Sequence, residues 1–414
     1  MTAATGSPVA THLGYGISDA DQHVYESAET IVEYLDPKYR SNFRLIEVDG
    51  RKTLLLNDRL YRLIPNPTFD PVGRPGTMVE YFRGNNPEGK SIRELCGPLQ
   101  TFDPAFRFCE PRMRVLDEQG VDFVWLLPTL ALGLEEMLWE TPEALAACVR
   151  AINRWMAEEW TFNIGDRVHA AGVLSFIDPV AAEQELRALL DAGCRLIGVR
   201  PAPVRLPGIC RSIGDPMYDR VWAMIAEAGA VVGFHGADTG YGDMIERWGE
   251  GGRMKCWESS PLGEIMGIHI ERPAYDTFAA LISHGVFRRH PGLKVAAIEL
   301  GAGWVPHLFH RMRTAYGKMP QAFDFCDPLD TFREHVWVTP FYEDDLQPVV
   351  DCVGVDRLIY GSDWPHPEGF ADPQEYIGDL AAFTPEDQRK ILRENLRALA
   401  LGPSCRAFRP SASE

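Results

Sequence analysis

The chain has 414 residues, of which 45% are hydrophobic and 24% charged, with a formal net charge of −18 and a pI of about 5.1. This size and composition permit a large buried core and exclude a disordered chain. The acidic balance argues against nucleic acid or an anionic membrane as a partner, because both bind surfaces rich in lysine and arginine.

The cysteines and the first residues bear on the cellular compartment. Nine cysteines are scattered along the chain with no CxxC pair, which predicts reduced thiols in the cytoplasm rather than a disulfide framework. The first 16 residues contain no basic segment followed by an apolar one, so we expect no signal peptide. No uncharged apolar run has the length needed to span a membrane.

The first predicted strand, residues 17–23, carries Asp19, Asp21 and His23 at alternating positions. Side chains two residues apart in a strand point to the same face. A polar strand face inside an α/β protein is costly unless a partner compensates it, and a metal ion would do so. Taken alone, this stretch also fits a turn that is rich in acidic residues.

About residues 36–112 do not alternate between strand and helix. Three short strand-like runs, 43–48, 52–56 and 60–64, are separated by Asp-Gly and Asn-Asp turn signals. The rest of this region is rich in proline, glycine and asparagine. We interpret it as a β-hairpin and loop insertion after the first strand that lies over an active site. A structural subdomain without a chemical role is the alternative.

From Val121 onward, apolar runs alternate with helical patterns. The predicted strands are 122–127, 168–176, 195–200, 230–235, 293–300, 335–339 and 357–360. The predicted helices are 141–163, 179–192, 216–228, 275–289, 302–316, 344–352, 373–382 and 385–401. With the first strand, this makes eight strands, the number that closes a (β/α)8 TIM barrel. We therefore predict one barrel domain over residues 1–414. A doubly wound sheet is the alternative, but the glycine-rich phosphate turn it would need is missing.

Polar residues lie where several predicted strands end. Asp21 and His23 end the first strand, His235 ends the fifth, Glu299 lies in the sixth, and Asp363 follows the eighth. In such a barrel these strand ends meet at one mouth. Several carboxylates resist burial together, and a divalent cation resolves the conflict. Mixed nitrogen and oxygen ligands suit zinc, manganese or Fe(II).

Four segments carry a resemblance to a known family. They are Asp-Ala-Asp-Gln-His at 19–23, Gly-Phe-His at 233–235, His-Pro-Gly-Leu-Lys-Val-Ala-Ala-Ile-Glu-Leu-Gly-Ala-Gly-Trp-Val-Pro at 290–306 and Tyr-Gly-Ser-Asp-Trp-Pro-His-Pro-Glu at 360–368. Over roughly residues 17–400 the chain resembles the amidohydrolase superfamily, in the branch of amino-carboxymuconate-semialdehyde decarboxylase and gamma-resorcylate decarboxylase. The resemblance implies one divalent ion, zinc or manganese. It also implies the metal ligands, which would be Asp21, His23, His235 and Asp363.

Two departures from that branch bear on the reaction. Asp21 stands in place of a histidine and favours harder metals such as manganese. Glu299 stands where the decarboxylases carry a histidine that acts on the metal-bound water or on the substrate. Glutamate is a competent general base, but it delivers a proton poorly unless its pKa is raised.

Three functions remain open from these residues. The first is non-oxidative decarboxylation of an aromatic or unsaturated carboxylic acid. The second is hydrolysis of an ester, lactone, amide or carbon–carbon bond, in which Glu299 or Asp363, the two predicted catalytic residues, takes a proton from a metal-bound water. The third is a barrel that has lost its chemistry. We expect a small carboxylic acid or carbonyl substrate.

The predicted substrate contacts come from three places. Arg200, at the end of the fourth strand, is positioned to bind a substrate carboxylate. Trp364 and His366 flank the predicted ligand Asp363, although His366 also fits a loop histidine in water. The long loop at 241–261 is predicted to line the pocket. A contact between protomers is the alternative for this loop, and we expect a homodimer or higher homo-oligomer.

Overall fold

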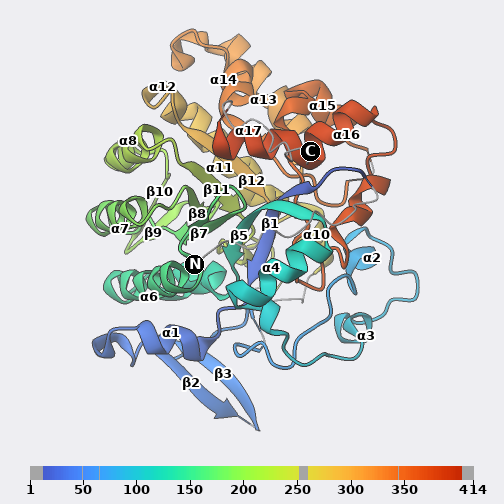
Figure 1. Ribbon diagram of the computed structural model, residues 1–414. Helices are drawn as coiled ribbons and strands as arrows, with labels where there is room; N and C mark the ends of the chain where they lie inside the picture. The colour runs from blue at the N-terminus through green and yellow to red at the C-terminus, as the bar shows by residue number, and fades with distance from the viewer. Residues whose placement is uncertain (1–12, 49, 65, 251–259, 344, 403–414) are drawn as a thin grey trace, which may run out of the picture.

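The computed structural model describes residues 13–48, 50–64, 66–250, 260–343 and 345–402. Its centre is a curled sheet of parallel strands (Figure 1). In spatial order these strands are β1 (Ile17–Val24), β5 (Val121–Pro128), β7 (Val168–Val173), β8 (Leu196–Val199), β11 (Val231–His235), β12 (Lys294–Ile298) and β13 (Val336–Val338). A short strand, β6 (Asn163–Ile164), pairs antiparallel with β7. The parallel order follows the chain order, as alternation of strand and helix requires.

The segment after β13 closes the ring. Ile359 N donates to Val338 O at 3.0 Å on one side. On the other side, Ala20 N donates to Tyr360 O at 2.8 Å. Asp363 N also donates to Asp21 O at 2.7 Å. The eighth predicted strand therefore takes its place between β13 and β1, although its hydrogen bonds are too sparse for a continuous ladder. The predicted (β/α)8 barrel is confirmed.

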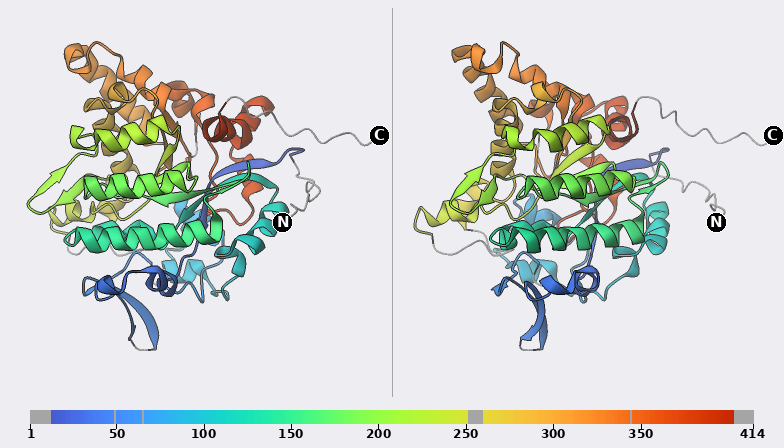
Figure 2. Two further views of the ribbon diagram at one scale, coloured as in Figure 1. Left: turned by 60° about the vertical axis from the view of Figure 1, so that its left-hand side comes forward. Right: turned by 90° about the vertical axis from the view of Figure 1, so that its left-hand side faces the viewer.

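The helices form an outer layer around the ring. Their main members are α4 (Cys109–Glu118), α6 (Pro142–Trp160), α7 (Pro179–Asp191), α8 (Asp219–Glu227), α11 (Glu271–Ser283), α13 (Trp304–Lys318), α15 (Gln347–Val353) and α17 (Asn395–Leu401). Figure 2 shows α6, α7 and α8 stacked side by side along one flank. Their starts follow from the sequence: α7 begins with Pro179, and the Asp178 side chain accepts hydrogen bonds from Val180 N and Ala181 N.

Some predicted helices are divided in the structure. The helix predicted at 275–289 begins earlier, at Glu271, and is followed by α12 (Val286–Arg289). The break falls at Gly285, whose φ of +70° is a left-handed conformation that favours glycine. The final predicted helix, 385–401, consists of α16 (Pro385–Arg389), a π-helical turn η8 (Lys390–Glu394) and α17. Before it in the chain, the helix predicted at 373–382 is only the short helix η7 (Pro373–Gly378).

The interior of the barrel is apolar below its mouth. Inward-facing side chains of the strands, such as Phe123, Trp125 and Leu196, form one buried cluster with Leu396 and Leu399 of α17. The C-terminal helix therefore closes the end of the barrel opposite to the strand ends where polar residues gather. No helix among the described residues is long and apolar enough to cross a membrane.

The region after β1 contains a small antiparallel sheet of its own. Its strands are β2 (Phe43–Val48), β3 (Arg51–Leu56) and β4 (Arg59–Leu60), and it projects from the barrel (Figure 1). Short helices α1 (Ala28–Tyr34), α2 (Val79–Phe82) and α3 (Ile92–Cys96) accompany it. The third strand is shorter than predicted, because only Arg59 and Leu60 pair with β3. Near α2, Met78 N donates to Pro367 O at 2.8 Å, next to the turn that follows Asp363.

Candidate metal centre

Four predicted residues meet at the mouth of the barrel. One possible ligand atom each from Asp21, His23, His235 and Glu299 lies within 4.8 Å of all the others. His23 Nε2 lies 3.0 Å from His235 Nε2. Asp21 Oδ1 lies 3.3 Å from His23 Nε2 and 3.2 Å from His235 Nε2. Glu299 Oε2 lies 3.3 Å from His235 Nε2. Two strand ends far apart in sequence, β1 and β11, thus supply the core of the group.

Hydrogen bonds on the far side of each ring determine which imidazole nitrogen faces the centre. His235 Nδ1 lies 2.8 Å from Gly236 O, an acceptor, so Nδ1 carries the proton. Thr129 Oγ1 donates to Val24 O at 2.9 Å and lies 3.2 Å from His23 Nδ1, which must then donate to it. In their neutral forms, both rings therefore present an unprotonated Nε2 to the other. Burial opposes protonation of His235, but the Asp21 carboxylate raises its pKa, so a proton between the two Nε2 atoms is the alternative to an ion.

Two lone pairs 3.0 Å apart repel each other unless a proton or a metal cation lies between them. Nitrogen ligands of one zinc ion lie about 2.0–2.1 Å from it, so two of them are at most about 4.2 Å apart. The nitrogen and carboxylate distances in the group, 3.0–3.3 Å, satisfy this limit. The residues present therefore fit a divalent ion.

Charge and burial shift the pKa values of this group. Burial opposes ionisation of Asp21, but the imidazoles of His235 and His23 lower the pKa of this carboxyl below its usual range. Burial lowers the pKa of His23 well below its ordinary value. Burial and the carboxylate of Asp363 raise the pKa of Glu299 well above its ordinary value. An ionised Asp21 beside a neutral His23 is the protonation state that metal binding requires.

Asp363 lies at the edge of this group. Its Oδ1 is 3.5 Å from His23 Nε2, and its Oδ2 is buried without a hydrogen-bond partner among the described residues. It belongs to two adjoining groups of possible ligands, one with His23 and His366 and one with Glu299, His366 and Glu368. The structure thus gathers all the predicted metal ligands at one rim, while their roles stay a prediction.

The backbone brings these side chains together by close approach. A Cβ at Gly361 would lie 2.7 Å from Asp21 Cβ, and one at Gly236 would lie 2.8 Å from Glu299 Oε2. Glycine is needed at both positions because any side chain would displace a member of the group. Glu299 and Asp363 have φ values of +52° and +57°, an uncommon conformation that often marks functional positions.

Asp19 does not join the ligand group, although it was predicted to share a strand face with Asp21 and His23. The pairing of β1 with β5 shifts register between Asp19 and Gln22, which breaks the alternation. Asp19 Oδ2 accepts from Ser362 Oγ at 2.6 Å and from Gln22 Nε2 at 3.0 Å. This carboxylate therefore ties the first strand to the last.

The structure gives Arg200 carboxylate partners within the chain. Its Nη2 lies 3.1 Å from Glu135 Oε1 and its Nη1 lies 3.1 Å from Glu136 Oε2. Arg200 and His235 also line the same small cavity of about 50 Å³. Substrate binding by Arg200 stays a prediction, and its guanidinium already has two anionic partners.

Trp364 and His366 both follow Asp363 in the chain, but they make different contacts. The Trp364 indole is buried and stacks under the guanidinium of Arg112 at 4.4 Å. His366 Nδ1 lies 2.6 Å from Asp363 Oδ1, and its ring lies 4.1 Å from that of His23. His366 thus touches the ligand group directly, whereas Trp364 packs toward the core. Their substrate contacts stay predictions.

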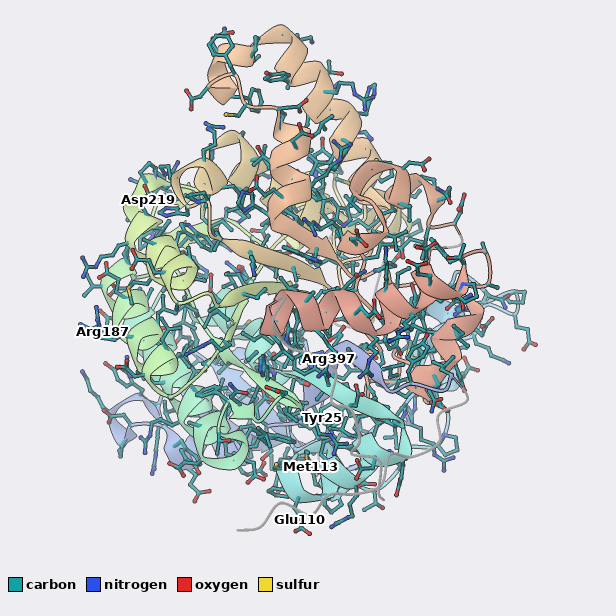
Figure 3. The ribbon with its side chains drawn as sticks, turned by 45° about the horizontal axis from the view of Figure 1, so that its top comes forward. Tyr25, Glu110, Met113, Arg187, Asp219 and Arg397 are labelled. Carbon is teal, nitrogen blue, oxygen red and sulfur yellow. The ribbon has the colours of Figure 1, made fainter. Side chains whose placement is uncertain are left out.

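The long loop at 241–261 lies partly outside the described residues, which omit 251–259. Its first part contributes Gly242 and Asp243 to a cavity of about 420 Å³. The same cavity is lined by the segment from Arg59 to Leu63 of the insertion. The loop and the insertion therefore line one cavity together, but none of the possible metal ligands lines it, so a role of the loop at the active site stays a prediction. Elsewhere, His290 pairs with Asp219 at 3.2 Å. Figure 3 shows Asp219 at the periphery of the molecule.

Three residues of the site had no predicted role. Thr129 orients His23 and lies 3.2 Å from His366 Nε2. Glu368 joins the second group of possible ligands. The buried hydroxyl of Tyr342 has no hydrogen-bond partner among the described residues. The sequence offered one signal for Glu368, its place five residues after Asp363 in the quoted 360–368 motif.

The fold and this group of side chains are those of a TIM-barrel protein with a site at its mouth that fits a metal ion. A family model described as amidohydrolase matches residues 19–399, so the chain belongs to the amidohydrolase family. It is similar to gamma-resorcylate decarboxylase of Rhodococcus jostii, with 25% identity over 299 residues, 70% of this chain and 86% of the relative. It is also similar to 2-amino-3-carboxymuconate-6-semialdehyde decarboxylase of Dictyostelium discoideum, with 28% identity over 332 residues, 77% of this chain and 81% of the relative.

Solved structures agree with this family. An amidohydrolase from Mycobacterium avium subsp. paratuberculosis is 38% identical, with a TM-score of 0.87 over 93% of this chain and 99% of that one. A dihydroxybenzoic acid decarboxylase from Polaromonas, solved with manganese and 2-nitroresorcinol, is 19% identical, with a TM-score of 0.57 over 78% of this chain and 93% of that one. The predicted resemblance to the decarboxylase branch is confirmed.

Proposed function

We propose that the chain is a metal-dependent carboxy-lyase that removes CO2 without oxidation from an aromatic or unsaturated carboxylic acid. The observation that carries the metal dependence is the pair of imidazole Nε2 atoms 3.0 Å apart, flanked by the carboxylate of Asp21. The names of the two decarboxylase relatives, and the manganese in the Polaromonas structure, support the reaction and the type of ion.

Each residue of the group has a place in this proposal. Asp21, His23, His235 and Asp363 would hold one divalent ion, zinc or manganese. When bound, the ion supplies positive charge that orients an anionic substrate and withdraws electron density from it. Glu299 is the most accessible member, with 15% of its side chain exposed against 0–2% for Asp21, His23 and His235. Its Oε2 is the atom we propose to hold or release a proton at the substrate.

The second candidate is hydrolysis, and Glu299 is the observation that favours it. A carboxylate 3.3 Å from His235 Nε2 is close enough to a shared ion to take a proton from a water in that space. The decarboxylases of the resembled branch have a histidine at this place, whereas a glutamate suits a general base. The same residues would serve decarboxylation and hydrolysis, so the two reactions are distinguished by identifying their products.

The experiment uses the purified full chain after loading with Mn²⁺ or Zn²⁺. We expect CO2 release from at least one member of a panel of hydroxybenzoates, including 2,6-dihydroxybenzoate, and of muconate-like acids. Glu299→Gln should lower that turnover at unchanged metal content, and His284→Asn, a histidine outside the site, should leave it unchanged. Hydrolysis of esters or lactones by a sample that releases no CO2 would replace the first proposal with the second.

A further inference from the structure

Two small cavities adjoin each other between the mouth of the barrel and its outer helices. The inner cavity, of about 50 Å³, is lined by His235 and by residues at the ends of β5, β7 and β8. The outer cavity, of about 20 Å³, lies between α6 and α7, which Figure 2 shows side by side. Val149, Leu174 and Ser175 line both cavities. The two cavities therefore meet at these three residues.

The lining of the inner cavity is mostly apolar. Its apolar members include Leu127, Leu132, Leu134, Leu145, Val149 and Val173. Its charged members, Arg200 and Glu135, pair with each other at 3.1 Å. Because Arg200 also pairs with Glu136 at 3.1 Å, its guanidinium offers no unpaired charge to a carboxylate or a bicarbonate ion. Apolar cavities of this kind stay dry and bind small uncharged molecules.

The size of the inner cavity excludes the organic part of a substrate. Pockets for organic ligands have volumes of about 300–1,000 Å³, several times the volume of this cavity. A water molecule needs only about 10–15 Å³, so the cavity has room for a molecule of a few atoms. Arg200 Nε is buried without a hydrogen-bond partner among the described residues, and its N–H is a donor for an uncharged oxygen. The cavity therefore suits a small neutral molecule that carries oxygen.

The proposed reaction releases such a molecule beside His235. Decarboxylation breaks the bond between the substrate and its carboxylate carbon. The bonding electrons stay on the substrate, which takes up a proton, and the carboxylate leaves as neutral CO2. His235 belongs to the candidate metal centre and also lines the inner cavity. CO2 released at this centre therefore lies next to an apolar space that the larger substrate cannot enter.

Hydrogen bonds fix the spacing of the helices around the outer cavity. Asn153 Nδ2 of α6 donates to Val173 O at 2.9 Å and to Glu185 Oε1 of α7 at 2.7 Å. Val173 N donates in return to Asn153 Oδ1 at 2.8 Å. These bonds tie α6, α7 and the end of β7 together, and Glu185 itself lines the outer cavity. Arg150, another lining residue, is exposed, so the outer cavity lies close to the surface.

We propose that the two cavities form a side passage through which CO2 leaves between α6 and α7, while the organic product leaves through the mouth of the barrel. The proposal rests on the decarboxylation proposed above. Val149, Leu174 and Ser175 separate the two cavities, and changes of side-chain rotamer, which are fast motions in proteins, join them. A separate exit keeps CO2 from remaining behind the larger product, where it could recombine with it.

The first test is xenon binding, because xenon is small and uncharged and enters apolar cavities without any turnover. Crystals of the full chain are pressurised with xenon, and anomalous scattering locates the bound atoms. We expect xenon in the inner cavity of the native chain. Ser175→Leu should lower its occupancy, since the larger side chain fills the junction of the cavities. Ser283→Leu, the same change at the exposed last residue of α11, should not.

The second test is the reverse reaction, carboxylation of the product of an acid that the native chain decarboxylates. Ser175→Leu should lower kcat/KM for CO2 about tenfold, the low end of the effect of one methylene group in an apolar pocket. The kcat/KM for the organic substrate should stay unchanged, and Ser283→Leu should change neither value. If Ser175→Leu does not fold, as judged by circular dichroism, Val149→Leu takes its place with the same expected result.

The outcomes separate this inference from the proposed function. A native chain that releases CO2 from none of the acids in the panel overturns the proposed function, and the passage of CO2 with it. A native chain that releases CO2 but binds no xenon in the inner cavity overturns the side passage alone. A blocked variant that keeps the native kcat/KM for CO2 does the same, because CO2 then reaches the site by another route.

Discussion

Two buried polar clusters lie at the mouth of the barrel, and they differ in how their charge is compensated. In the first, Arg200 pairs with Glu135 and Glu136, and Arg205 pairs with Glu136 at 2.7 Å. In the second, the carboxylates around His23 and His235 have imidazoles as neighbours and no arginine or lysine partner among the described residues.

This difference separates a structural cluster from a site that takes a ligand. The arginine cluster is complete without any further group, because each glutamate already has a guanidinium within 3.1 Å. The imidazole–carboxylate cluster is incomplete, because its carboxylates outnumber its imidazoles at the centre and no lysine or arginine pairs with them among the described residues. Arg200 follows β8 just as His235 ends β11, so a place at a strand end alone does not reveal which cluster carries the chemistry.

The largest effect is expected when a predicted metal ligand is removed from the imidazole–carboxylate cluster. In His235→Ala we expect the affinity for Mn²⁺ to fall at least about 1000-fold, since residues that only orient a metal ligand are worth about 10- to 100-fold. Equilibrium dialysis with metal analysis measures this change. His284→Asn is the matched control, because His284 Nδ1 bonds Ser212 Oγ at 2.8 Å outside the site. Retention of native affinity by His235→Ala would remove His235 from the ligand set.

Removal of the Arg200 guanidinium from the arginine cluster should instead lower the free energy of unfolding and leave the affinity for metal unchanged. Arg200→Met leaves Glu135 and Glu136 with less compensation in a buried site, and breaking a buried pair in this way costs about 3–5 kcal/mol. Urea unfolding of the metal-free protein measures the loss. The double variant Arg200→Met with Glu135→Gln should recover part of it. Native stability together with a raised KM would show that Arg200 serves the substrate instead.

Much of the fold could be predicted because seven apolar runs alternate with helices after the insertion, and period and length are local properties. The closing segment was predicted correctly for the same reason, although Gly361 and the turn after it leave few ladder bonds. The short third strand of the insertion was overestimated. Its length depends on how many of its residues pair with β3, and only Arg59 and Leu60 do so. The local sequence pattern does not reveal the extent of this pairing.

The site was predictable where it depends on strand ends and less so where it depends on pairing across loops. Asp21, His23 and His235 meet because parallel strands end at one rim. The partners of Arg200 lie in the segment after β5, 64 and 65 residues away in sequence, and sequence spacing does not reveal such a pairing. The role of Thr129 was missed because its hydroxyl contacts the imidazoles of both His23 and His366, and this proximity is visible only in three dimensions.

The smallest effect concerns a buried imidazole with no place in either cluster. His169 of β7 packs its ring on Phe123 at 5.1 Å, and burial lowers its pKa to about 4. The unfolded chain binds this proton near pH 6.5, so the contribution of His169 to stability is complete above that pH and is lost as pH falls toward 4. The loss reaches about 3 kcal/mol at most. Unfolding of metal-free protein between pH 7 and 4.5 should therefore show a smaller decline for His169→Leu than for the native chain. Equal declines would mean that His169 keeps its ordinary pKa in the folded protein.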